Sequence, residues 1–427
     1  MIIDILKKIP LVRRLYSNFK LFPFKFKHQR LIKDIRRRNT LNVVFYAMNL
    51  PMWRYQNLYV ELNKKTNFNV YIVLSPCITY SKEQQIEDIK TLEKYFQENN
   101  ISYIDYDFTT SEIFDVKKNI NPDMVFYPQP YSGLLNELHD SRNFYDKLIC
   151  YYPYAFWTAN GEWSYNSQFH NVAWRLFYST NLHLKDAKKW ADNRGRNVSV
   201  VGYPNSDIFC SLEKNLFQTN IWKDCNKYKK RIIWAPHFSI GNEKRLINFG
   251  NFLWMADFML EIAEKYKDSI QFAFRPHPRL LTELCDEKYW GKEKTYEYYN
   301  KWDKMENAQL SINSNFAELF ISSDAMIHDC GSFTVEYHYT NNPVMFIVKD
   351  ENVHRKSLNN FGKLAFDAHY KGASQSDIIQ FIEDVVLKGI DPMKENRKIF
   401  FDKYLSQKDG ISVAEKTADE IIKLLKL

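Results

Sequence analysis

Short apolar runs alternate with longer amphipathic segments along most of this chain, from Leu41 onward. In the first half, the runs that read as buried strands are residues 41–48, 69–74, 101–106, 123–128, 147–152, 175–178 and 198–201. Residues 81–99, between two of these runs, have the amphipathic pattern of a helix that begins at Ser81. This alternation of strand and helix predicts a parallel, doubly wound sheet.

The same pattern restarts after a polar, poorly patterned stretch at residues 210–230. Further strands are predicted at residues 231–236, 271–276, 325–328 and 343–348, with a long helix at 246–266 and closing helices at 374–388, 391–405 and 411–425. With 427 residues, the chain is too long for a single core. We therefore expect an α/β fold with two doubly wound, Rossmann-like domains, at residues 39–215 and 216–427, facing a cleft at the carboxyl ends of their strands.

Composition excludes several kinds of site. Glycine is scarce, with 12 residues, and neither GxGxxG nor GxxxxGK[S/T] occurs, which excludes the common dinucleotide and P-loop motifs. The six cysteines are dispersed without a CxxC pair, which indicates reduced structural thiols rather than disulfides or a zinc site. We expect no metal and no cofactor.

The excess positive charge of the chain is confined to its first tenth. Residues 1–38 hold 12 Lys or Arg and 2 Asp, whereas the remaining residues carry 47 basic and 49 acidic groups. Apolar residues alternate with these cations, as in FKLFPFKFK at residues 19–27, a composition suited to anionic lipid headgroups. We predict that residues 1–38 are an amphipathic membrane-surface segment; the alternative is a basic arm packed on the protein's own acidic surface.

The expected location of the protein is the cytoplasm, peripheral on the inner face of the cell membrane. No apolar run approaches the ~18 residues that a membrane span requires, and the N-terminus has no secretory signal pattern. No basic stripe continues beyond residue 38, which argues against nucleic acid as a partner.

The segment SDAMIHDCGSFTVEYHYTNNPVMFIV, residues 323–348, predicts a strand, a tight turn at 329–332, a helix at 333–339 and a second strand. A helix that begins in such a turn has unpaired backbone N–H groups and a positive dipole end, which suit a phosphate. Gly331 allows close backbone approach, and Ser332 adds a hydroxyl at the N-cap position. The alternative is an ordinary turn in which Ser332 only caps its helix.

Two more loops follow predicted strands on the same edge of this sheet. His237 lies in Ala-Pro-His, and Arg275 and His277 lie in Arg-Pro-His-Pro. Prolines fix the backbone on both sides of His277, and the fork of the Arg275 guanidinium suits phosphate oxygens. Taken alone, each histidine is better explained as a structural residue. Together with Ser332, we expect the three side chains to surround one anionic group.

Glu336 lies four residues after Ser332, about one turn into the predicted helix. Its carboxylate could accept hydrogen bonds from a ribose, or it could be an ordinary solvated helix charge. The spacing does not separate these two interpretations.

Four short blocks, in order, resemble the CDP-glycerol glycerophosphotransferase family, the enzymes that build poly(polyol phosphate) teichoic-acid chains. VVGYPNSDIF (200–209) resembles the family's Gly-Tyr-Pro-Arg-Asn-Asp block, and RIIWAPHF (231–238) resembles its Tyr-Ala-Pro-Thr-Phe strand. FRPHP (274–278) is similar to Arg-x-His-Pro, and SDAMIHDCGSFTVEY (323–337) is similar to Ser-Asp-Tyr-Ser-Ser-x-x-x-Asp-Tyr. The resemblance extends from about Val43 to Val348.

The resemblance implies a GT-B-like transferase that holds a CDP-linked donor, CDP-glycerol or similar, in the C-terminal domain. The acceptor, a lipid-linked or glycan hydroxyl, would enter from the N-terminal domain. His277 would correspond to a functional histidine of the family, and Asp329, Ser332 and Glu336 to residues of its last block. Helix-end N–H groups with His or Arg side chains, rather than a metal, would stabilise the departing phosphate.

The chain departs from the family pattern at several positions. The family's Trp-His-Gly, whose histidine is its candidate general base, is replaced by YYPYAFWTANGEW at residues 151–163. Gly331 replaces the first serine of the Ser-Ser pair, and His237 replaces a threonine. The attacking hydroxyl still requires a base. The candidates are His237, which has the best predicted position, and Glu162 and His170 on the acceptor side.

Three functions are consistent with these residues. The first is transfer of a polyol-phosphate unit from a CDP-activated donor to a surface-glycan or lipid-linked acceptor, independent of metal. The second is a glycosyltransferase of the same architecture that uses a CMP- or UDP-sugar in surface polysaccharide synthesis. The third is a catalytically inactive scaffold of such an assembly, which the missing Trp-His-Gly favours and the second-domain residues oppose.

Overall fold

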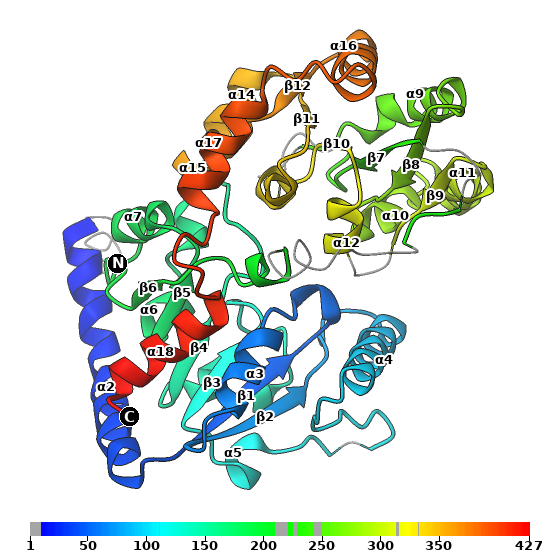
Figure 1. Ribbon diagram of the computed structural model, residues 1–427. Coiled ribbons are helices and arrows are strands. Elements are labelled where there is room, and N and C mark those ends of the chain that lie inside the picture. Colours follow the sequence, from blue (N-terminus) through cyan, green and yellow to red (C-terminus); the bar gives the residue numbers. More distant parts are fainter. Residues whose placement is uncertain are drawn as a thin grey trace. The chain divides into compact units, whose positions relative to one another are not determined.

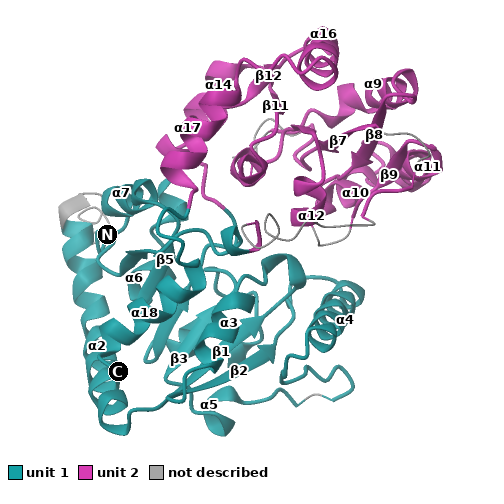
Figure 2. Ribbon diagram, viewed as in Figure 1, with its two compact units in different colours: residues 1–155, 161–207, 407–427 teal, residues 156–160, 208–406 magenta. Residues whose placement is uncertain are grey.

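The computed structural model describes residues 10–110, 112–209, 221–224, 229–241, 249–312, 316–331 and 333–427. The chain forms two compact units (Figure 2). Unit 1 comprises Met1–Ala155, Gly161–Asp207 and Gln407–Leu427, and unit 2 comprises Phe156–Asn160 and Ile208–Ser406. The predicted domain boundary, between residues 215 and 216, falls outside the described residues.

Unit 1 is built on six parallel strands in the order β2-β1-β3-β4-β5-β6 (Figure 1). The bounds are β1 Leu41–Ala47, β2 Phe68–Leu74, β3 Met124–Tyr127, β4 Leu148–Tyr151, β5 Arg175–Tyr178 and β6 Val198–Val200. Every residue of β3 and β4 is buried, as expected for central strands of a parallel sheet. The strand order places the topological switch point between β1 and β3.

Helices of unit 1 come from the first half of the chain and from its last segment. Their bounds are α2 Pro10–Arg38, α3 Gln56–Asn63, α4 Lys82–Glu98, α5 Val116–Asn119, α6 Gln168–Val172, α7 Asn181–Trp190 and α18 Val413–Leu425. The carboxylate of Asp207 accepts hydrogen bonds from the backbone N–H groups of Val413 and Ala414, at 2.8 and 3.1 Å. These bonds satisfy two of the donors at the start of α18 and attach the last helix to unit 1.

The predicted strand at residues 101–106 is wrong. Only Ile104 pairs with the sheet, in a single parallel bridge to Val73. Beyond it, the carboxylate of Asp107 accepts a hydrogen bond from the backbone N–H of Thr109 at 2.7 Å. Such local side-chain bonds compete with a strand ladder and favour a turn.

Unit 2 has a second sheet of six parallel strands, in the order β12-β11-β10-β7-β8-β9. The bounds are β7 Lys230–Ala235, β8 Ile270–Phe274, β9 Ala308–Leu310, β10 Ala325–His328, β11 Val344–Ile347 and β12 Tyr370–Gly372. The two outermost strands, β9 and β12, are three residues long and were not predicted. Because β7 and β10 are neighbours, the switch point of this sheet lies between them.

Helices flank this second sheet. The bounds are α9 Phe252–Lys265, α10 Pro278–Leu284, α11 Gly291–Lys304, α12 Phe316–Ile321, α13 Phe333–Glu336, α14 Glu351–Ser357, α15 Asn360–Asp367, α16 Gln375–Gln380, a π-helix at Phe381–Leu387, and α17 Lys394–Tyr404. Trp234, Phe274 and Trp302 stack in the core, with the Phe274 ring centroid 4.9 and 5.1 Å from those of the two tryptophans. This packing covers one face of β7 and β8.

Residues 156–160 belong to unit 2 although the residues on both sides belong to unit 1. Ala159 forms an antiparallel bridge with Leu358, and Asn359 Nδ2 donates to the backbone oxygen of Trp157 at 2.8 Å. The block that replaces Trp-His-Gly is therefore divided between the two units.

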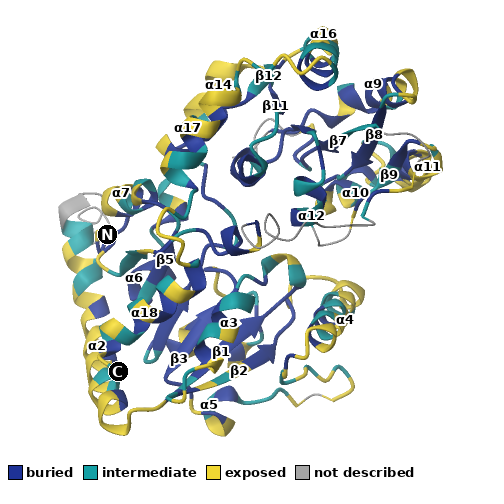
Figure 3. Ribbon diagram, viewed as in Figure 1, coloured by how far each residue is buried: buried dark blue, intermediate teal, exposed yellow. Residues whose placement is uncertain are grey.

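The central strands of both sheets are buried, and many exposed residues lie on the helices (Figure 3). Within the described part of the chain, no helix combines the length and the apolar character that a membrane span requires.

Candidate functional site

Three loops meet at the switch point of unit 2. His237 follows β7, Arg275 and His277 follow β8, and Asp329 follows β10. The His237 backbone N–H donates to Asp329 Oδ1 at 2.5 Å, and the His277 backbone N–H donates to the oxygen of Pro236 at 3.0 Å. The structure therefore brings these predicted residues together at the edge of the sheet where doubly wound domains bind ligands.

Asp329 holds this edge together from within the protein. It is 2% exposed, and its second oxygen accepts bonds from the backbone N–H and the side-chain amide of Asn251, at 2.6 and 3.3 Å. Burial raises the pKa of Asp329 to about 7, while the N–H donors of His237 and Asn251 oppose that shift. Its carboxylate thus joins the β7 and β10 loops to the start of α9.

Ser239 fixes the ring of His237. The hydroxyl of Ser239 lies 2.8 Å from Nδ1 of His237, and the Ser239 backbone N–H donates to the same nitrogen at 3.2 Å. The hydroxyl oxygen also accepts the N–H groups of Phe249 and Gly250, at 2.9 and 3.1 Å. Its own proton is therefore directed to Nδ1, and the neutral ring carries its proton on Nε2.

His277 has the same arrangement in the neighbouring loop. It is the N-cap of α10, where its Nδ1 accepts the backbone N–H of Arg279 at 3.2 Å. Burial and the nearby Arg279 charge lower the pKa of His277 to about 4. The neutral ring again carries its proton on Nε2, and its centroid lies 5.3 Å from that of His237. In this tautomer, the two imidazoles are neighbouring N–H donors.

Arg275 supplies the positive charge of this site. Its Nη1 donates to the backbone oxygen and hydroxyl of Ser311, at 3.3 and 3.5 Å. Burial lowers the pKa of the guanidinium to about 10, and the nearby charge of Glu336 opposes the shift. Glu336 is 3% exposed, which excludes the interpretation as a solvated helix charge.

The turn after β10 is only partly described. Gly331 is partly exposed, and a Cβ added there would meet Phe249 at 3.4 Å, an ordinary contact distance. Ser332 lies outside the described residues, so its predicted role as a phosphate ligand or helix cap stays a prediction.

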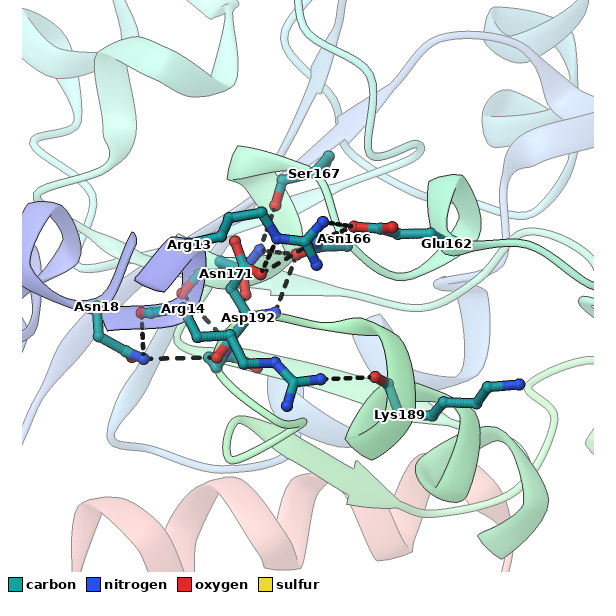
Figure 4. A network of polar contacts seen from close by, with 10 residues as sticks. Arg13, Arg14, Asn18, Glu162, Asn166, Ser167, Asn171, Lys189 and Asp192 are labelled. Carbon is teal, nitrogen blue, oxygen red and sulfur yellow. Dashed lines mark hydrogen bonds and ion pairs between the residues drawn. The ribbon is translucent and has the colours of Figure 1, made fainter. Parts of the chain in front are cut away.

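The acceptor-side candidates, Glu162 and His170, belong to unit 1. Glu162 forms an ion pair with Arg13 of α2 at 2.9 Å, in the polar network of Figure 4. His170 is buried in α6, where the hydroxyl of Ser167 lies 2.7 Å from its Nδ1. Burial lowers the pKa of His170 to about 4. Glu162 thus anchors α2, whereas His170 is a neutral buried ring.

Within the described residues, no group of three or more His, Cys, Asp or Glu side chains is arranged to hold a metal ion. Besides the buried Asp329 carboxylate, the unit 2 switch point carries the imidazole N–H groups of His237 and His277 and the guanidinium of Arg275. Such a set suits the oxygens of a phosphate.

The sequence model of the CDP-glycerol:poly(glycerophosphate) glycerophosphotransferase family matches residues 158–423, which is more than half of the chain. The chain belongs to this family. The match spans the described residues of the switch point in unit 2. The prediction of the family from four sequence blocks is confirmed.

Similar proteins agree with this family assignment. The minor teichoic acid biosynthesis protein GgaB of Bacillus subtilis (strain 168) is 25% identical over 184 residues, which cover 43% of this chain and 16% of that protein. The chain therefore spans about a sixth of the length of this curated relative.

Solved structures show the same fold. The wall teichoic acid polymerase TagF has a TM-score of 0.59 at 13% identity, covering 99% of this chain and 98% of that chain. The UDP-GlcNAc 2-epimerase of Neisseria meningitidis, bound to UDP-GlcNAc, has a TM-score of 0.57 at 15% identity, covering 91% and 100%. The prediction of two parallel α/β domains is confirmed.

The sequence did not reveal the residues that hold the switch-point loops of unit 2 in place. Ser239 and Asn251 are both buried and connect loops that are up to 78 residues apart in sequence. The helix predicted at 246–266 begins at Phe252 among the described residues, with Asn251 as its N-cap, and the partner of that asparagine is not evident from sequence.

Proposed function

We propose that this protein transfers a glycerol-phosphate unit, or a related polyol phosphate, from a CDP-linked donor to a hydroxyl of a surface-glycan or lipid-linked acceptor. The observation that carries the proposal is the cluster of His237, Arg275 and His277 at the unit 2 switch point. The family description names CDP-glycerol, and one solved TagF structure was soaked with CDPG.

The proposed reaction is an in-line displacement at the β-phosphorus of the donor. The acceptor hydroxyl forms a new P–O bond, the bond to the bridging oxygen breaks, CMP leaves, and the acceptor proton passes to a base. Negative charge grows on the CMP phosphate as it leaves. The Nε2–H groups of His237 and His277 and the guanidinium of Arg275 would stabilise that charge, which supports a reaction independent of metal.

A panel of nucleotide donors tests this proposal directly. Purified protein is incubated with CDP-glycerol, CDP-ribitol, a CMP-sugar or a UDP-sugar and a poly(glycerol phosphate) acceptor, with and without EDTA. We expect CMP release from a CDP-polyol, unchanged by EDTA. Release of UDP from the UDP-sugar would instead support the glycosyltransferase alternative. If no donor is bound or cleaved, the protein is better explained as a catalytically inactive scaffold.

We also propose that α2 docks on an anionic membrane surface with one of its two faces. The inward face is occupied by unit 1: Leu21, His28 and Ile35, spaced seven residues apart, are buried. Arg13 bonds Asp192 at 3.1 Å, and Arg36 Nε donates to the backbone oxygen of Leu425 at 2.7 Å. Figure 4 shows this anchoring near the start of the helix.

The outward face of α2 is apolar in its first half and basic in its second. Leu15, Phe19, Phe22 and Phe26 follow the helical repeat and are between 45% and 80% exposed. The exposed cations of the helix include Lys20, Lys27, Arg30, Lys33 and Arg37. Inserted aromatic rings with adjacent cations suit a bilayer of anionic lipids, which would place the protein at the cytoplasmic face of the cell membrane.

Vesicle co-sedimentation tests the docking proposal. The double variant Phe19→Ser/Phe22→Ser should partition onto phosphatidylglycerol vesicles at least about tenfold less than the parent protein, because it lacks two exposed rings that would insert into the bilayer. Tyr296→Ser is the matched control, since Tyr296 of α11 is 52% exposed on unit 2. Equal sedimentation of the double variant and the parent protein would contradict docking through this face.

A further inference from the structure

A basic loop lies beside α2 in unit 1. It comprises residues 191–197, with the sequence ADNRGRN, and connects α7 to β6. The end of α7 and this loop both contact the first half of α2. Arg14 Nη2 donates to the backbone oxygen of Lys189 at 2.8 Å, and Arg13 Nε donates to Asp192 Oδ1 at 3.1 Å (Figure 4). The loop and the helix are therefore parts of one surface of unit 1.

A network of asparagines fixes the shape of this loop. The backbone N–H of Asn193 donates to Asn171 Oδ1 at 2.9 Å. The side-chain oxygen of Asn193 accepts the N–H of Gly195, and its amide donates to Asn197 Oδ1, both at 2.8 Å. The amide of Asn197 donates in turn to the backbone oxygen of Ala173 at 2.7 Å. Because these groups satisfy one another, the network holds the loop in one conformation.

The exposed residues of this loop are Arg194 and Arg196, while the residue between them is buried. Arg194 has a φ of 58°, in the left-handed region that glycine and asparagine enter readily and arginine rarely adopts. The one acid of the loop, Asp192, is paired with Arg13. Two guanidinium groups thus face solvent, and within the described residues no carboxylate forms an ion pair with either of them.

Lys25 of α2 adds a third cation to this surface. Its Nζ donates to Asn18 Oδ1 at 3.4 Å, and partial burial together with the nearby charge of Arg196 lowers the pKa of Lys25. Asn18 Nδ2 donates to the backbone oxygen of Asp192 at 3.5 Å. Phe22 lies four residues after Asn18 and three before Lys25, so it is the neighbour of both on the helix surface. The exposed aromatic face of α2 therefore continues into the basic loop.

We propose that Arg194, Arg196 and Lys25 form a headgroup site that binds the phosphodiester of an anionic phospholipid, while Phe22 inserts into the bilayer beside it. Exposed rings next to cations suit the boundary between acyl chains and anionic headgroups, whereas a soluble polyanion would use only the cations. Planar guanidinium groups bind two phosphodiester oxygens at once, which an ammonium group does not. This inference rests on the proposed docking of α2 and extends the membrane contact to a second element of unit 1.

Co-sedimentation of the full chain with phosphatidylglycerol vesicles tests this site. Arg194→Asn/Arg196→Gln should partition onto the vesicles at least about tenfold less than the parent protein, because two cations near the anionic surface are lost. Its Tm should equal or exceed that of the parent protein, since asparagine tolerates the left-handed conformation at position 194. Arg194→Lys/Arg196→Lys keeps both charges but loses the bidentate contacts, and it should partition about threefold less.

Lys292→Gln/Lys294→Gln is the matched control. It removes two exposed cations from α11 of unit 2 and should partition as the parent protein does. CMP release from CDP-glycerol in solution should be the same in the parent protein and all variants.

Equal partitioning of the parent protein and Arg194→Asn/Arg196→Gln would overturn the headgroup site. If that variant then fails to bind a soluble glycerol-phosphate oligomer that the parent protein binds, the loop serves a free polyanion instead. Parent-like partitioning of Arg194→Lys/Arg196→Lys would also overturn the site, because it would indicate a general attraction between charges. A parent protein that does not sediment with these vesicles would refute the docking of α2 itself.

Discussion

The two sheets of this protein share an architecture and differ in the chemistry at their switch points. Both are six-stranded and fully parallel. In unit 2 the switch-point loops carry His237, His277 and Arg275, whereas in unit 1 they carry tyrosine hydroxyls and Arg54. We propose that the sheet sets where a ligand binds, and that a few loop side chains set which ligand it is.

The loops also differ in how firmly they are held. In unit 2, Asp329 and Ser239 accept bonds from several backbone N–H groups and so fix the histidine-bearing loop. In unit 1, the hydroxyls of Tyr151 and Tyr178 have no partner in the described structure. We interpret the arrangement in unit 2 as preorganised for phosphate.

The largest expected effect is the loss of His277. Replacing it by alanine removes the Nε2–H that faces the proposed leaving phosphate and should lower kcat at least about a hundredfold. Steady-state CMP release from CDP-glycerol measures this. Because His277 also caps α10, His277→Asn, which can keep the cap bond through its Oδ1, separates a folding defect from a chemical one. Parent-like turnover in both variants would remove His277 from the mechanism.

Asp329→Ala should be the most destabilising of these changes. It leaves the backbone N–H groups of His237 and Asn251 buried without an acceptor, at a cost of about 3 kcal/mol in the free energy of unfolding. Urea denaturation measures this cost. Asp367→Ala is the control: it breaks an exposed ion pair with Arg355 and should cost less than about 1 kcal/mol. Equal costs would show that Asp329 does not hold the loops together.

The tautomer of His237 predicts a smaller and more selective effect. His237→Gln can place an amide N–H where Nε2–H stood, whereas His237→Asn places its amide near Nδ1. If His237 is a hydrogen-bond donor, the glutamine variant should keep about tenfold more kcat/KM than the asparagine variant. A general base predicts equal loss in both variants and a rate that falls as pH is lowered through the pKa of the base.

The smallest expected effect concerns acid stability of unit 2. His354 packs against Phe249 and Phe346, with ring centroids 4.7 and 4.5 Å away, and burial lowers its pKa to about 4. Because its pKa in the folded state lies below the unfolded value, the stabilising contribution is complete above about pH 6.5 and is lost as the pH falls toward 4. His354→Phe should reduce the loss of stability between pH 7 and 5.5 by about 1 kcal/mol, measured by urea denaturation. An unchanged pH dependence would contradict this.

The fold could be predicted because buried parallel strands are continuous apolar runs. The runs at residues 325–328 and 175–178 coincide with β10 and β5. The strand β12, Tyr370–Gly372, has two half-buried positions and three residues in all, too few for such a pattern. The false strand at 101–106 has the right composition, and only its local turn bonds exclude it from the sheet.

From the sequence, only the site residues that directly follow a predicted strand could be identified. The positions of His237 and His277 follow from the ends of β7 and β8. The role of Ser239 could not be predicted, because it depends on a hydroxyl that meets the backbone of Phe249, ten residues away in sequence. The unpartnered hydroxyls of unit 1 are equally invisible in sequence, since Tyr127 and Tyr151 both end apolar runs but differ in what their hydroxyls contact.

Calorimetric titration with CDP-glycerol, in EDTA, tests the central claim that the unit 2 switch point binds a CDP-linked donor. The parent protein and the unit 1 variant Tyr151→Phe/Tyr178→Phe should bind CDP-glycerol with equal affinity. Arg275→Gln should bind it at least about tenfold more weakly, because a charged donor to phosphate is lost. Unchanged affinity in Arg275→Gln together with weaker binding in the unit 1 variant would contradict the account.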